Sequence, residues 1–455
     1  MIKIPIPPVL HKMQNIFSSE GYEAYLVGGA VRDFIMCKKA ADFDVATNAT
    51  PQQVLSLFHH VIPTGIEHGT VTVMLMNTPI EVTTYRTENT YTDGRHPDKI
   101  AYAATIEEDL SRRDFTMNAI AADLKTGLLT DPFNGQKDIK DKIIRTVGNP
   151  KERFSEDGLR PVRAVRFASQ LNFDIEMKTF EAISISLETV KKVAIERFQE
   201  EFKKIMKSPL PSKGLFLLEK TGLMEIFLPE LLFCRGCLQK GFHSYDVLDH
   251  LYYTADGAPA DNLDVRLAAL FHDIGKPAVR AQKPSGEYTF YQHEKKSAEI
   301  CETILNRLRF PKSTVTTVSH LVRQHMFFYE DNWTDAAVRR FLVRIGYREN
   351  PAVLDNLFLL RRADIYGMKR QLPPPELLIP FQNRIEKILL AQNALSVKDL
   401  AVNGQMLIKS GIPAGKHMGI ILKELLETVL EDPSANTKEK LILVAGNIYK
   451  KLSPY

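Results

Sequence analysis

The sequence is poor in cysteine and has no long apolar run. Its four cysteines are too few for a disulfide framework in 455 residues and favour a reducing cytoplasm. Cys234 and Cys237 have the spacing of metal ligands, but no second Cys/His pair follows at zinc-finger distance, so two half-buried thiols are the preferred interpretation. No stretch reaches the roughly 18 apolar residues of a membrane span, and the first residues lack a signal-peptide core. We therefore expect a cytoplasmic protein without a membrane partner.

Neither an excess of one charge nor a repeat or low-complexity tract marks the chain. The formal net charge is +4 at pH 7, which is compatible with an RNA partner and does not require one. With 44% hydrophobic and 25% charged residues, the composition is that of an ordinary globular protein. The length alone implies roughly two to four domains.

The most informative stretch lies between residues 26 and 50. Gly28 and Gly29 follow a short apolar run typical of a strand, and the next residues have the pattern of a helix start. Adjacent glycines allow a sharp turn close to a bulky anion, and a helix N-terminus behind them directs free N–H groups at that anion. Arg32 adds a guanidinium that matches a phosphate. The stretch therefore predicts a phosphate-binding turn.

Two carboxylates follow on the next predicted strand. Asp42 and Asp44 are two residues apart, so on a strand both side chains leave the same face. Such a pair suits phosphoryl transfer with two Mg²⁺ ions. An isolated Asp-x-Asp most often lies in a solvent-exposed loop and has no catalytic role. Glu81, on a later predicted strand, is either a third metal-facing carboxylate or a charge at a strand edge.

The glycine turn and the Asp-x-Asp about 13 residues after Gly29 resemble, in combination, the nucleotidyltransferases of the DNA polymerase β superfamily. The resemblance is to the bacterial (class II) tRNA CCA-adding enzyme and poly(A) polymerase family in particular. It implies an α+β fold, with a small mixed sheet in the head and helical regions after it. It also implies that Asp42 and Asp44 hold Mg²⁺, while Gly28, Gly29 and Arg32 bind nucleotide.

Two further stretches resemble the same family. The Arg-Arg-Asp-Phe-Thr sequence at 112–116 is similar to a family motif, in which Arg113 would contact the triphosphate or the ribose. Alone, it would be a solvated basic turn. Residues 87–104 are polar and rich in Tyr, Asp and Gly, which predicts a mobile loop. In the family a loop at this place is implicated in adding the terminal A, so its presence favours addition of the full CCA.

A basic segment follows at residues 153–167. Asp157, Arg160 and Arg163 recur at i, i+3 and i+6, and Arg166 extends the row, so successive pairs share a helix face. A solvated basic helix is the plain interpretation, and Pro161 is unusual in a helix interior. The segment resembles the family's Glu-Asp-x-x-Arg motif, whose side chains act as a protein template for the incoming base.

The template hypothesis agrees with base chemistry. Cytosine and adenine both present an exocyclic amine beside a ring-nitrogen acceptor, which a carboxylate and a guanidinium can bind together. Uracil and guanine present a carbonyl there, so the carboxylate would lose its partner at a cost of about 1–3 kcal/mol. One site could thus accept CTP and ATP and refuse UTP and GTP.

The second half of the chain contains an ordered set of histidines and aspartates. The order His…His-Asp…Asp resembles the HD phosphohydrolase superfamily, an all-helical metal site, and two more histidines fall where binuclear members have extra ligands. A transition metal or Mg²⁺ suits imidazole and carboxylate ligands, and hydrolytic activity is left open. The expected ligands of this second divalent metal are His250, His272, Asp273 and Asp364, with His293 and His325 as the extra pair.

We expect five regions along the chain. These are a nucleotidyltransferase head (1–142), a neck with the base-selecting helix (143–175), a helical body (176–237), an HD domain (238–372) and a helical tail that binds tRNA (373–455). The expected function is addition of CCA to tRNA from CTP and ATP. The alternatives are an enzyme that adds only A, a poly(A) polymerase with the same site, and an HD phosphohydrolase acting on RNA 3′ ends. The sequence carries no signal for an oligomeric state.

Overall fold

The computed structural model describes residues 3–40, 42–88, 100–239, 244–330, 332–391 and 394–452. Two compact units divide the chain. The first comprises Met1–Phe233 and Arg307–Phe310, and the second comprises Cys234–Asn306 and Pro311–Tyr455. Within the described ranges, no helix is both long and apolar enough to cross a bilayer.

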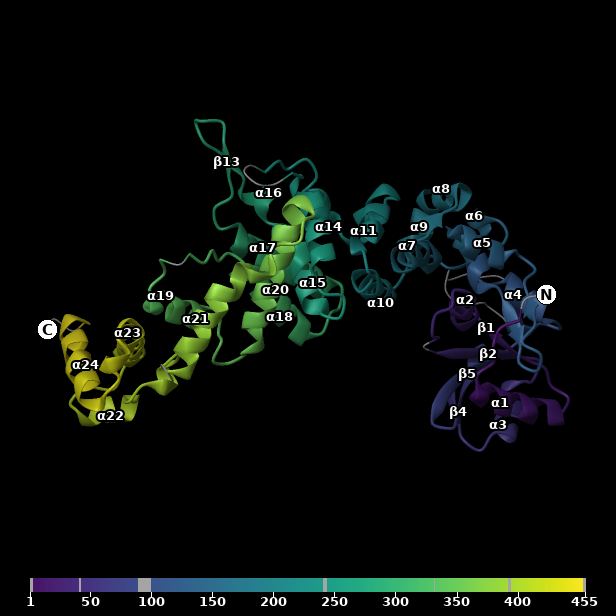
Figure 1. Cartoon of the computed structure of the whole chain (residues 1–455), viewed down its shortest axis with the longest axis horizontal. Coiled ribbons are helices and arrows are strands. Elements are labelled where there is room, and N and C mark those ends of the chain that lie inside the picture. Colours follow the sequence, from purple (N-terminus) through teal and green to yellow (C-terminus); the bar gives the residue numbers. More distant parts are fainter. Residues whose placement is uncertain are drawn as a thin grey trace. The chain divides into compact units, whose positions relative to one another are not determined.

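A mixed seven-stranded sheet forms the centre of the head, in the order β3-β4-β5-β2-β1-β8-β9 (Figure 1). Strands β2 and β5 run parallel, and the other neighbours are antiparallel. Their bounds are β1 (Ala24–Val27), β2 (Phe43–Thr47), β3 (Val61–Gly65), β4 (Thr70–Leu75), β5 (Thr78–Thr84), β8 (Ala121–Asp123) and β9 (Leu129–Thr130). The prediction of a small mixed sheet is confirmed, although β3 has no clear signal in the sequence.

Helices flank this sheet. They are α1 (Pro8–Ser19), α2 (Gly29–Ile35), α3 (Pro51–Leu57), α4 (Ile106–Ser111) and α5 (Gly135–Asp141). Helix α3 packs on β4 (Figure 1) and begins at a capping box, in which Thr50 and Gln53 satisfy each other's backbone N–H. The core beneath includes Val27, Tyr85 and Leu110.

The predicted mobile loop lies mostly outside the described residues, because its centre at 89–99 is not described. Its flanks pair as antiparallel strands β6 (Arg86–Glu88) and β7 (Ile100–Tyr102).

Beyond the head, the first unit is helical apart from one pair of two-residue strands, β10 (Ile143–Ile144) and β11 (Asp174–Ile175). The helices are α6 (Pro150–Glu156), α7 (Leu159–Leu171), α8 (Met177–Ile185), α9 (Leu187–Val190), α10 (Ile195–Met206), α11 (Pro211–Lys220), α12 (Leu223–Phe227) and α13 (Pro229–Leu232). Helix α7 packs against α10 and α11.

The expectation that Asp157 shares one helix with Arg160 and Arg163 is wrong. The chain leaves the helical conformation at Asp157, which has φ −144° and ψ 111° after the end of α6. Its carboxylate accepts a hydrogen bond from the N–H of Leu159, the first residue of α7. Because α7 starts at Leu159, Pro161 lies in its first turn, where a missing N–H costs nothing.

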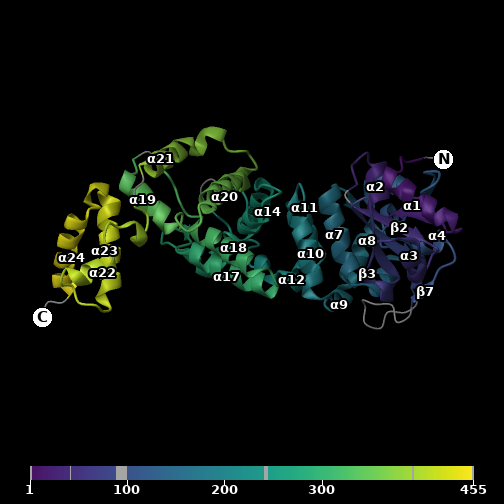
Figure 2. The ribbon, with the colours of Figure 1, turned by 90° about the horizontal axis from the view of Figure 1, so that it is seen from below.

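The second unit is a bundle of helices with one small hairpin (Figures 1 and 2). The helices are α14 (Val247–Gly257), α15 (Leu263–Phe271), α16 (Lys276–Val279), α17 (His293–Arg307), α18 (Lys312–Gln324), α19 (Asp335–Arg344), α20 (Ala352–Lys369), α21 (Ile379–Leu390), α22 (Gly404–Lys409), α23 (His417–Glu431) and α24 (Lys438–Leu452). The hairpin strands are β12 (Ala281–Gln282) and β13 (Tyr288–Thr289). Short 3₁₀ helices in the two units span Ile66–His68, Thr116–Asn118, Pro375–Leu378, Val397–Asp399 and Pro433–Ala435.

A glycine allows the two central helices of this unit to approach closely. Helix α14 packs along α20, and α15 packs on both α14 and α18. A Cβ atom at Gly367 would lie 2.0 Å from Oγ1 of Thr254 and 2.9 Å from its backbone nitrogen. Any larger residue at this position would therefore separate α14 from α20.

Candidate active sites

The glycine turn after β1 brings Asp44 and Arg113 together. Gly28 has φ +71°, a left-handed conformation that residues with a side chain rarely adopt. A Cβ atom at Gly28 would lie 3.2 Å from Nη1 of Arg113 and 3.4 Å from Oδ2 of Asp44. The turn therefore serves both as the start of α2 and as the space in which a carboxylate and a guanidinium converge.

The two predicted metal-binding carboxylates do not both lie on a strand. Asp42 precedes β2 and is exposed, whereas Asp44 lies within β2 and is partly buried. In the parallel pairing of β2 with β5, Asp44 is opposite Glu81, so the two side chains share one face of the sheet. Burial, and then the negative charge of Glu81, raise the pKa of Asp44 to about 6. Carboxylates that destabilise one another in this way favour a bound cation, and oxygen donors suit a hard divalent ion.

Asp44 and Glu81 line a cavity of about 430 Å³ between the sheet and the neck, and Asp42 is not among its lining residues. Arginines and carboxylates dominate its wall, and the arginines are more numerous. This excess of positive charge suits a polyanion such as a triphosphate. The charged residues that line it are Asp44, Glu81, Arg86, Arg112, Arg113, Asp114, Asp157, Arg160, Arg163 and Arg197.

Of the proposed base-reading residues, Asp157 reaches this cavity from the turn between α6 and α7, and Arg160 reaches it from α7. Asp157 accepts two hydrogen bonds from Arg197 on α10, at 3.1 Å from Nη1 and 2.8 Å from Nη2. Arg160 donates to the backbone oxygens of Arg153 at 3.0 Å and Arg112 at 3.1 Å, and it pairs with Glu156. Both side chains are thus held in place before any nucleotide binds.

Arg163 connects the neck to the head. Its Nε and Nη2 donate to Oδ2 of Asp114 at 2.8 Å and 2.6 Å. The other oxygen of Asp114 accepts from the N–H of Phe115 at 2.8 Å and from Nδ2 of Asn118 at 3.1 Å. Burial alone would raise the pKa of Asp114, but Arg163 and these hydrogen bonds outweigh it and lower the pKa to about 2.

Arg32 and Arg166 lie beside the cavity wall, against Phe167. The guanidinium of Arg32 donates to Oδ1 of Asn118 at 2.8 Å and lies 5.3 Å from the Phe167 ring centroid. Arg166 stacks on the same ring at 3.5 Å and pairs with Glu201 at 2.5 Å. Through these contacts, Arg32 and Arg166 support the cavity wall from behind. The site of the missing Cβ of Gly29 is 3.5 Å from Nη2 of Arg32.

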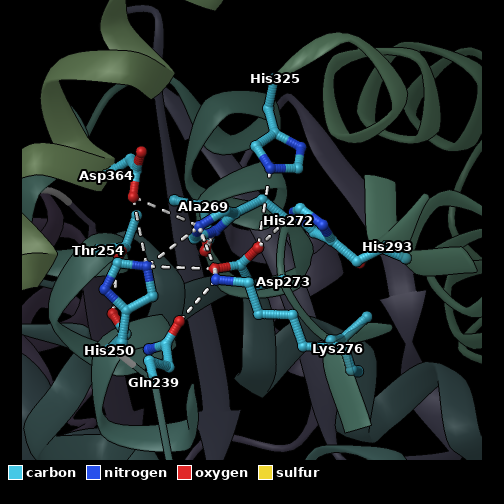
Figure 3. Close-up of polar contacts among 12 residues, drawn as sticks. Gln239, His250, Thr254, Ala269, His272, Asp273, Lys276, His293, His325 and Asp364 are labelled. Carbon is cyan, nitrogen blue, oxygen red and sulfur yellow. Dashed lines mark hydrogen bonds and ion pairs between the residues drawn. The ribbon is translucent and has the colours of Figure 1, made fainter. Parts of the chain in front are cut away.

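The second unit contains a separate cluster of imidazoles and carboxylates (Figure 3). Nε2 of His250, from α14, lies 3.1 Å from Nε2 of His272 at the end of α15. Oδ1 of Asp364, from α20, lies 3.3 Å from His250 and 3.6 Å from His272. Oδ2 of Asp273 lies 3.2 Å from Nε2 of His272. The four residues predicted from the sequence are thus brought together.

Asp273 also faces the extra histidine pair. Its Oδ1 lies 3.1 Å from Nε2 of His293 and 3.7 Å from Nε2 of His325 (Figure 3). His272, His293 and His325 each place Nδ1 within 2.9 Å of a backbone oxygen, which aims Nε2 into the cluster. Two groups of potential metal ligands therefore share Asp273, with His250 and His272 in one and His293 and His325 in the other.

The charge states of this cluster favour cations. Burial alone would raise the pKa of Asp273, but His272 and Lys276 outweigh it and hold the pKa well below its usual range. Burial and the neighbouring His272 lower the pKa of His325 to about 3, so its imidazole is neutral. Burial alone would lower the pKa of His272, but Asp273 and Asp364 outweigh it and raise the pKa to about 10, so a divalent metal would have to displace that proton. Ionised carboxylates and imidazoles are nevertheless the ligand types that such a metal takes, and the residues fit one.

Three family matches follow the chain in order. The Poly A polymerase head domain matches residues 24–145, the "Probable RNA and SrmB- binding site of polymerase A" matches 172–234, and the HD domain matches 241–368. A CCA-adding enzyme of Levilactobacillus brevis is 32% identical over 435 residues, which cover 96% of this chain and 95% of that protein. The chain belongs to the CCA-adding enzyme family. One from Anoxybacillus flavithermus is also 32% identical, over 92% of each chain.

A solved structure supports the same assignment. The Bacillus stearothermophilus CCA-adding enzyme, in complex with CTP, aligns with a TM-score of 0.72 and 27% identity. The alignment covers 99% of this chain and 100% of that chain. The predicted family and fold class are therefore confirmed over essentially the whole chain.

Several residues at these sites were not expected from the sequence. Arg197 and Asp114 line the cavity beside Asp44, and Lys276 and Arg361 line a cavity at the cluster of imidazoles and carboxylates. Asp114 belongs to the Arg-Arg-Asp-Phe-Thr motif, and Lys276 and Arg361 lie three residues from Asp273 and Asp364. Their positions in the sequence could therefore have indicated that they belong to the sites. Arg197 lies 40 positions after Asp157 and carried no such signal.

Proposed function

We infer that the chain adds C, C and A to the 3′ end of tRNA from CTP and ATP, without a nucleic-acid template. The 3′-hydroxyl oxygen forms a bond to the α-phosphorus, and the bond from that phosphorus to the bridging oxygen of pyrophosphate breaks. The observation that carries this function is the convergence of Asp44, Arg113, Asp157 and Arg160 on one cavity. Family membership supports the reaction independently.

We assign Asp42 and Asp44 to a Mg²⁺ site. When bound, Mg²⁺ would supply charge stabilisation for the attacking and leaving oxygens. The raised pKa of Asp44 and its pairing with Glu81 support a cation here. Arg113, held beside Asp44 by Asp109 at 3.2 Å, would bind the triphosphate or ribose. Gly28 and Gly29 allow the phosphates to approach the backbone.

We assign base selection to Asp157 and Arg160. Asp157 would accept a hydrogen bond from the exocyclic amine of cytosine or adenine, while Arg160 would donate one to the ring nitrogen. Arg197 supports this role, because its two hydrogen bonds fix the carboxylate before the base arrives. Arg163 would hold the neck against the head through Asp114, and Arg32 and Arg166 would stiffen the same region through Phe167.

The extent of addition is tested with three tRNA transcripts, ending before the tail, after C and after CC. Each is incubated with CTP alone, ATP alone and both nucleotides. The full activity extends all three transcripts to CCA and then stops. Extension of only the CC transcript would identify an A-adding enzyme, and continued addition of A would identify a poly(A) polymerase.

A second function is favoured by the two ligand groups that share Asp273. We propose that the HD domain hydrolyses a phosphomonoester or a 2′,3′-cyclic phosphate at an RNA 3′ end. A damaged end of this kind blocks addition, which gives a reason for two sites in one chain. The test supplies purified protein with Ni²⁺, Co²⁺ or Mn²⁺ and follows both phosphate classes. If none of these metals supports hydrolysis of either phosphate class, the proposed hydrolase function is refuted.

We further propose a division of labour along the chain. The head and neck (1–175) would perform addition, the body (176–237) would support them, residues 238–372 would carry the metal-dependent hydrolase, and the helical tail (373–455) would bind tRNA, mostly by shape and backbone. All four cysteines are unpaired, which supports the cytoplasmic assignment.

A further inference from the structure

The cavity beside Asp44 carries two hydroxyl groups to which no part of the nucleotide is assigned. Oγ1 of Thr70, the first residue of β4, lies 3.0 Å from Oγ1 of Thr83 on β5. Both residues line the cavity, and both are half-buried. The triphosphate and the base have partners elsewhere in the cavity, which leaves these hydroxyls for the second substrate, the tRNA.

The hydroxyl pair lies across the carboxylates from the phosphate-binding turn. Strands β1, β2, β5 and β4 are neighbours in this order (Figure 1), Gly28 follows β1, and Asp44 lies on β2. Glu81 and Thr83 lie on β5, two residues apart, so their side chains share one face of the sheet. Thr70 is opposite Thr83 in the pairing of β4 with β5. From β1 outward, the sheet therefore presents the turn, then the two carboxylates, then the two hydroxyls.

The geometry of phosphoryl transfer requires the tRNA end on this side. The attacking and leaving oxygens lie roughly in line, on opposite sides of the phosphorus. Arg113, beside Gly28, is assigned to the triphosphate, so pyrophosphate would leave toward β1 and the 3′-hydroxyl would attack from the side of β5 and β4. Because neighbouring strands are about 4.8 Å apart, a single nucleotide can reach from Asp44 to the hydroxyl pair.

The hydroxyl pair can donate and accept at the same time. A threonine hydroxyl has one proton and two lone pairs. One member of the pair donates to the other, so one proton is left for a ligand. Among the described residues, neither hydroxyl has a further hydrogen-bond partner. A phosphate oxygen would only accept, whereas a ribose 2′-hydroxyl also donates and accepts and so matches the pair in both directions.

We propose that Thr70 and Thr83 bind the 2′-hydroxyl of the terminal ribose of the tRNA and so place the adjacent 3′-hydroxyl for attack. The inference rests on the proposed nucleotide addition and adds the residues that hold the RNA end. Since a 2′-hydroxyl is what distinguishes RNA from DNA, the pair restricts addition to RNA ends. Neither threonine takes part in making or breaking a bond.

The kinetic test combines two proteins with two RNA ends. The parent and Thr70→Val/Thr83→Val add A to tRNA transcripts that end in CC, one with a terminal ribose and one with a terminal 2′-deoxyribose that keeps its 3′-hydroxyl. Valine has the shape of threonine and suits a strand. In the parent, the 2′-deoxy end should lower kcat/KM for tRNA roughly tenfold, because hydrogen bonds are lost. The valine variant should show that loss already with the ribose end and no further loss with the 2′-deoxy end, while KM for ATP stays unchanged.

Thr64→Val/Thr72→Val is the matched control. Thr64 and Thr72 form a second hydroxyl pair on the same sheet, between β3 and β4 at 2.9 Å, but neither lines the cavity. This variant should keep the parent kcat/KM for both RNA ends. Thr70→Ser/Thr83→Ser retains the two hydroxyls and should restore the parent preference for the ribose end.

Three results would overturn the inference while nucleotide addition stands. The first is a valine variant that still prefers the ribose end as strongly as the parent does, because the 2′-hydroxyl would then be bound elsewhere. The second is a parent that extends both ends equally well. The third is an equal loss in the Thr64→Val/Thr72→Val control, which would make the effect one of sheet stability. A parent that extends neither end would instead refute the proposed function, and the inference with it.

Discussion

Replacing Asp114 by asparagine should loosen the connection between head and neck. The side chain of Asp114 is 8% exposed and accepts four hydrogen bonds, two of them from the guanidinium of Arg163. In the Asp114→Asn variant the amide oxygen can keep the bonds from Phe115 and Asn118. Its NH₂ group then faces the donors of Arg163, which leaves a half-buried positive charge without its partner.

The magnitude follows from the pKa of Asp114. A fall of the pKa from its ordinary value of 3.8 to about 2 corresponds to about 2 kcal/mol of stabilisation by the ionised carboxylate. Because the folded pKa lies below the unfolded one, this contribution is present above about pH 4. It is lost as the pH falls through the folded pKa, near 2. The difference between parent and variant should therefore shrink over that interval.

The assay must read the first unit by itself. Trp333 is the only tryptophan and belongs to the second unit, so its fluorescence follows that unit and serves as an internal control. Hydrogen exchange of peptides from α7 and residues 112–118 reports the first unit. Asp141→Asn, which removes an exposed pair with Lys137, is the matched variant and should change neither signal. An Asp114→Asn protein with parent-like exchange at pH 7, or a loss that persists unchanged to pH 2, would refute the reasoning.

Three further predictions concern the two activities. Asp44→Ala should abolish nucleotide addition and leave tRNA affinity nearly intact, since charge stabilisation of this kind carries several kcal/mol of a barrier; near-normal turnover would contradict the metal assignment. Asp157→Ala should loosen the choice between CTP and UTP more than it weakens triphosphate binding, and Arg197→Ala should reproduce part of that loss, measured as ratios of kcat/KM. A variant that loses binding but keeps selectivity would contradict the template hypothesis. His272→Ala/Asp273→Ala should remove phosphohydrolase activity and leave CCA addition to intact tRNA unchanged, whereas a double variant that still hydrolyses would make the cluster structural.

The parts of the first site that could be predicted are those set by local geometry. A glycine pair after an apolar run predicts a turn. In the structure, Gly28 has the left-handed conformation that favours glycine. Glu81 was expected on a strand, and it lies in β5. A Thr-Pro pair is a typical helix start, and α3 begins at Pro51 with Thr50 as its cap. Each of these signals acts over a few residues, and so it can be read in order along the chain.

The parts that could not be predicted depend on residues far apart in the sequence. The i, i+3, i+6 spacing suggested one helix through Asp157, but the chain breaks there. Its carboxylate instead caps the start of α7 and binds Arg197 on α10. Spacing alone cannot distinguish these cases, because a helix face and a turn at a helix start both bring residues three apart into proximity. The pairing partner decides between them, and tertiary packing supplies it.

The two sites differ in the chemistry of their charged groups, which gives the two proposed activities different metal requirements. Six arginines and four carboxylates line the first cavity, so it attracts a polyanion that brings its own need for a hard cation. The second cluster places ionised Asp273 among imidazoles, one of which stays neutral because of burial. We expect borderline metals to suit that ligand set better than Mg²⁺ does. If the chain has both proposed activities, their metal preferences should differ, and we expect a change in the supply of one ion to affect one reaction without the other.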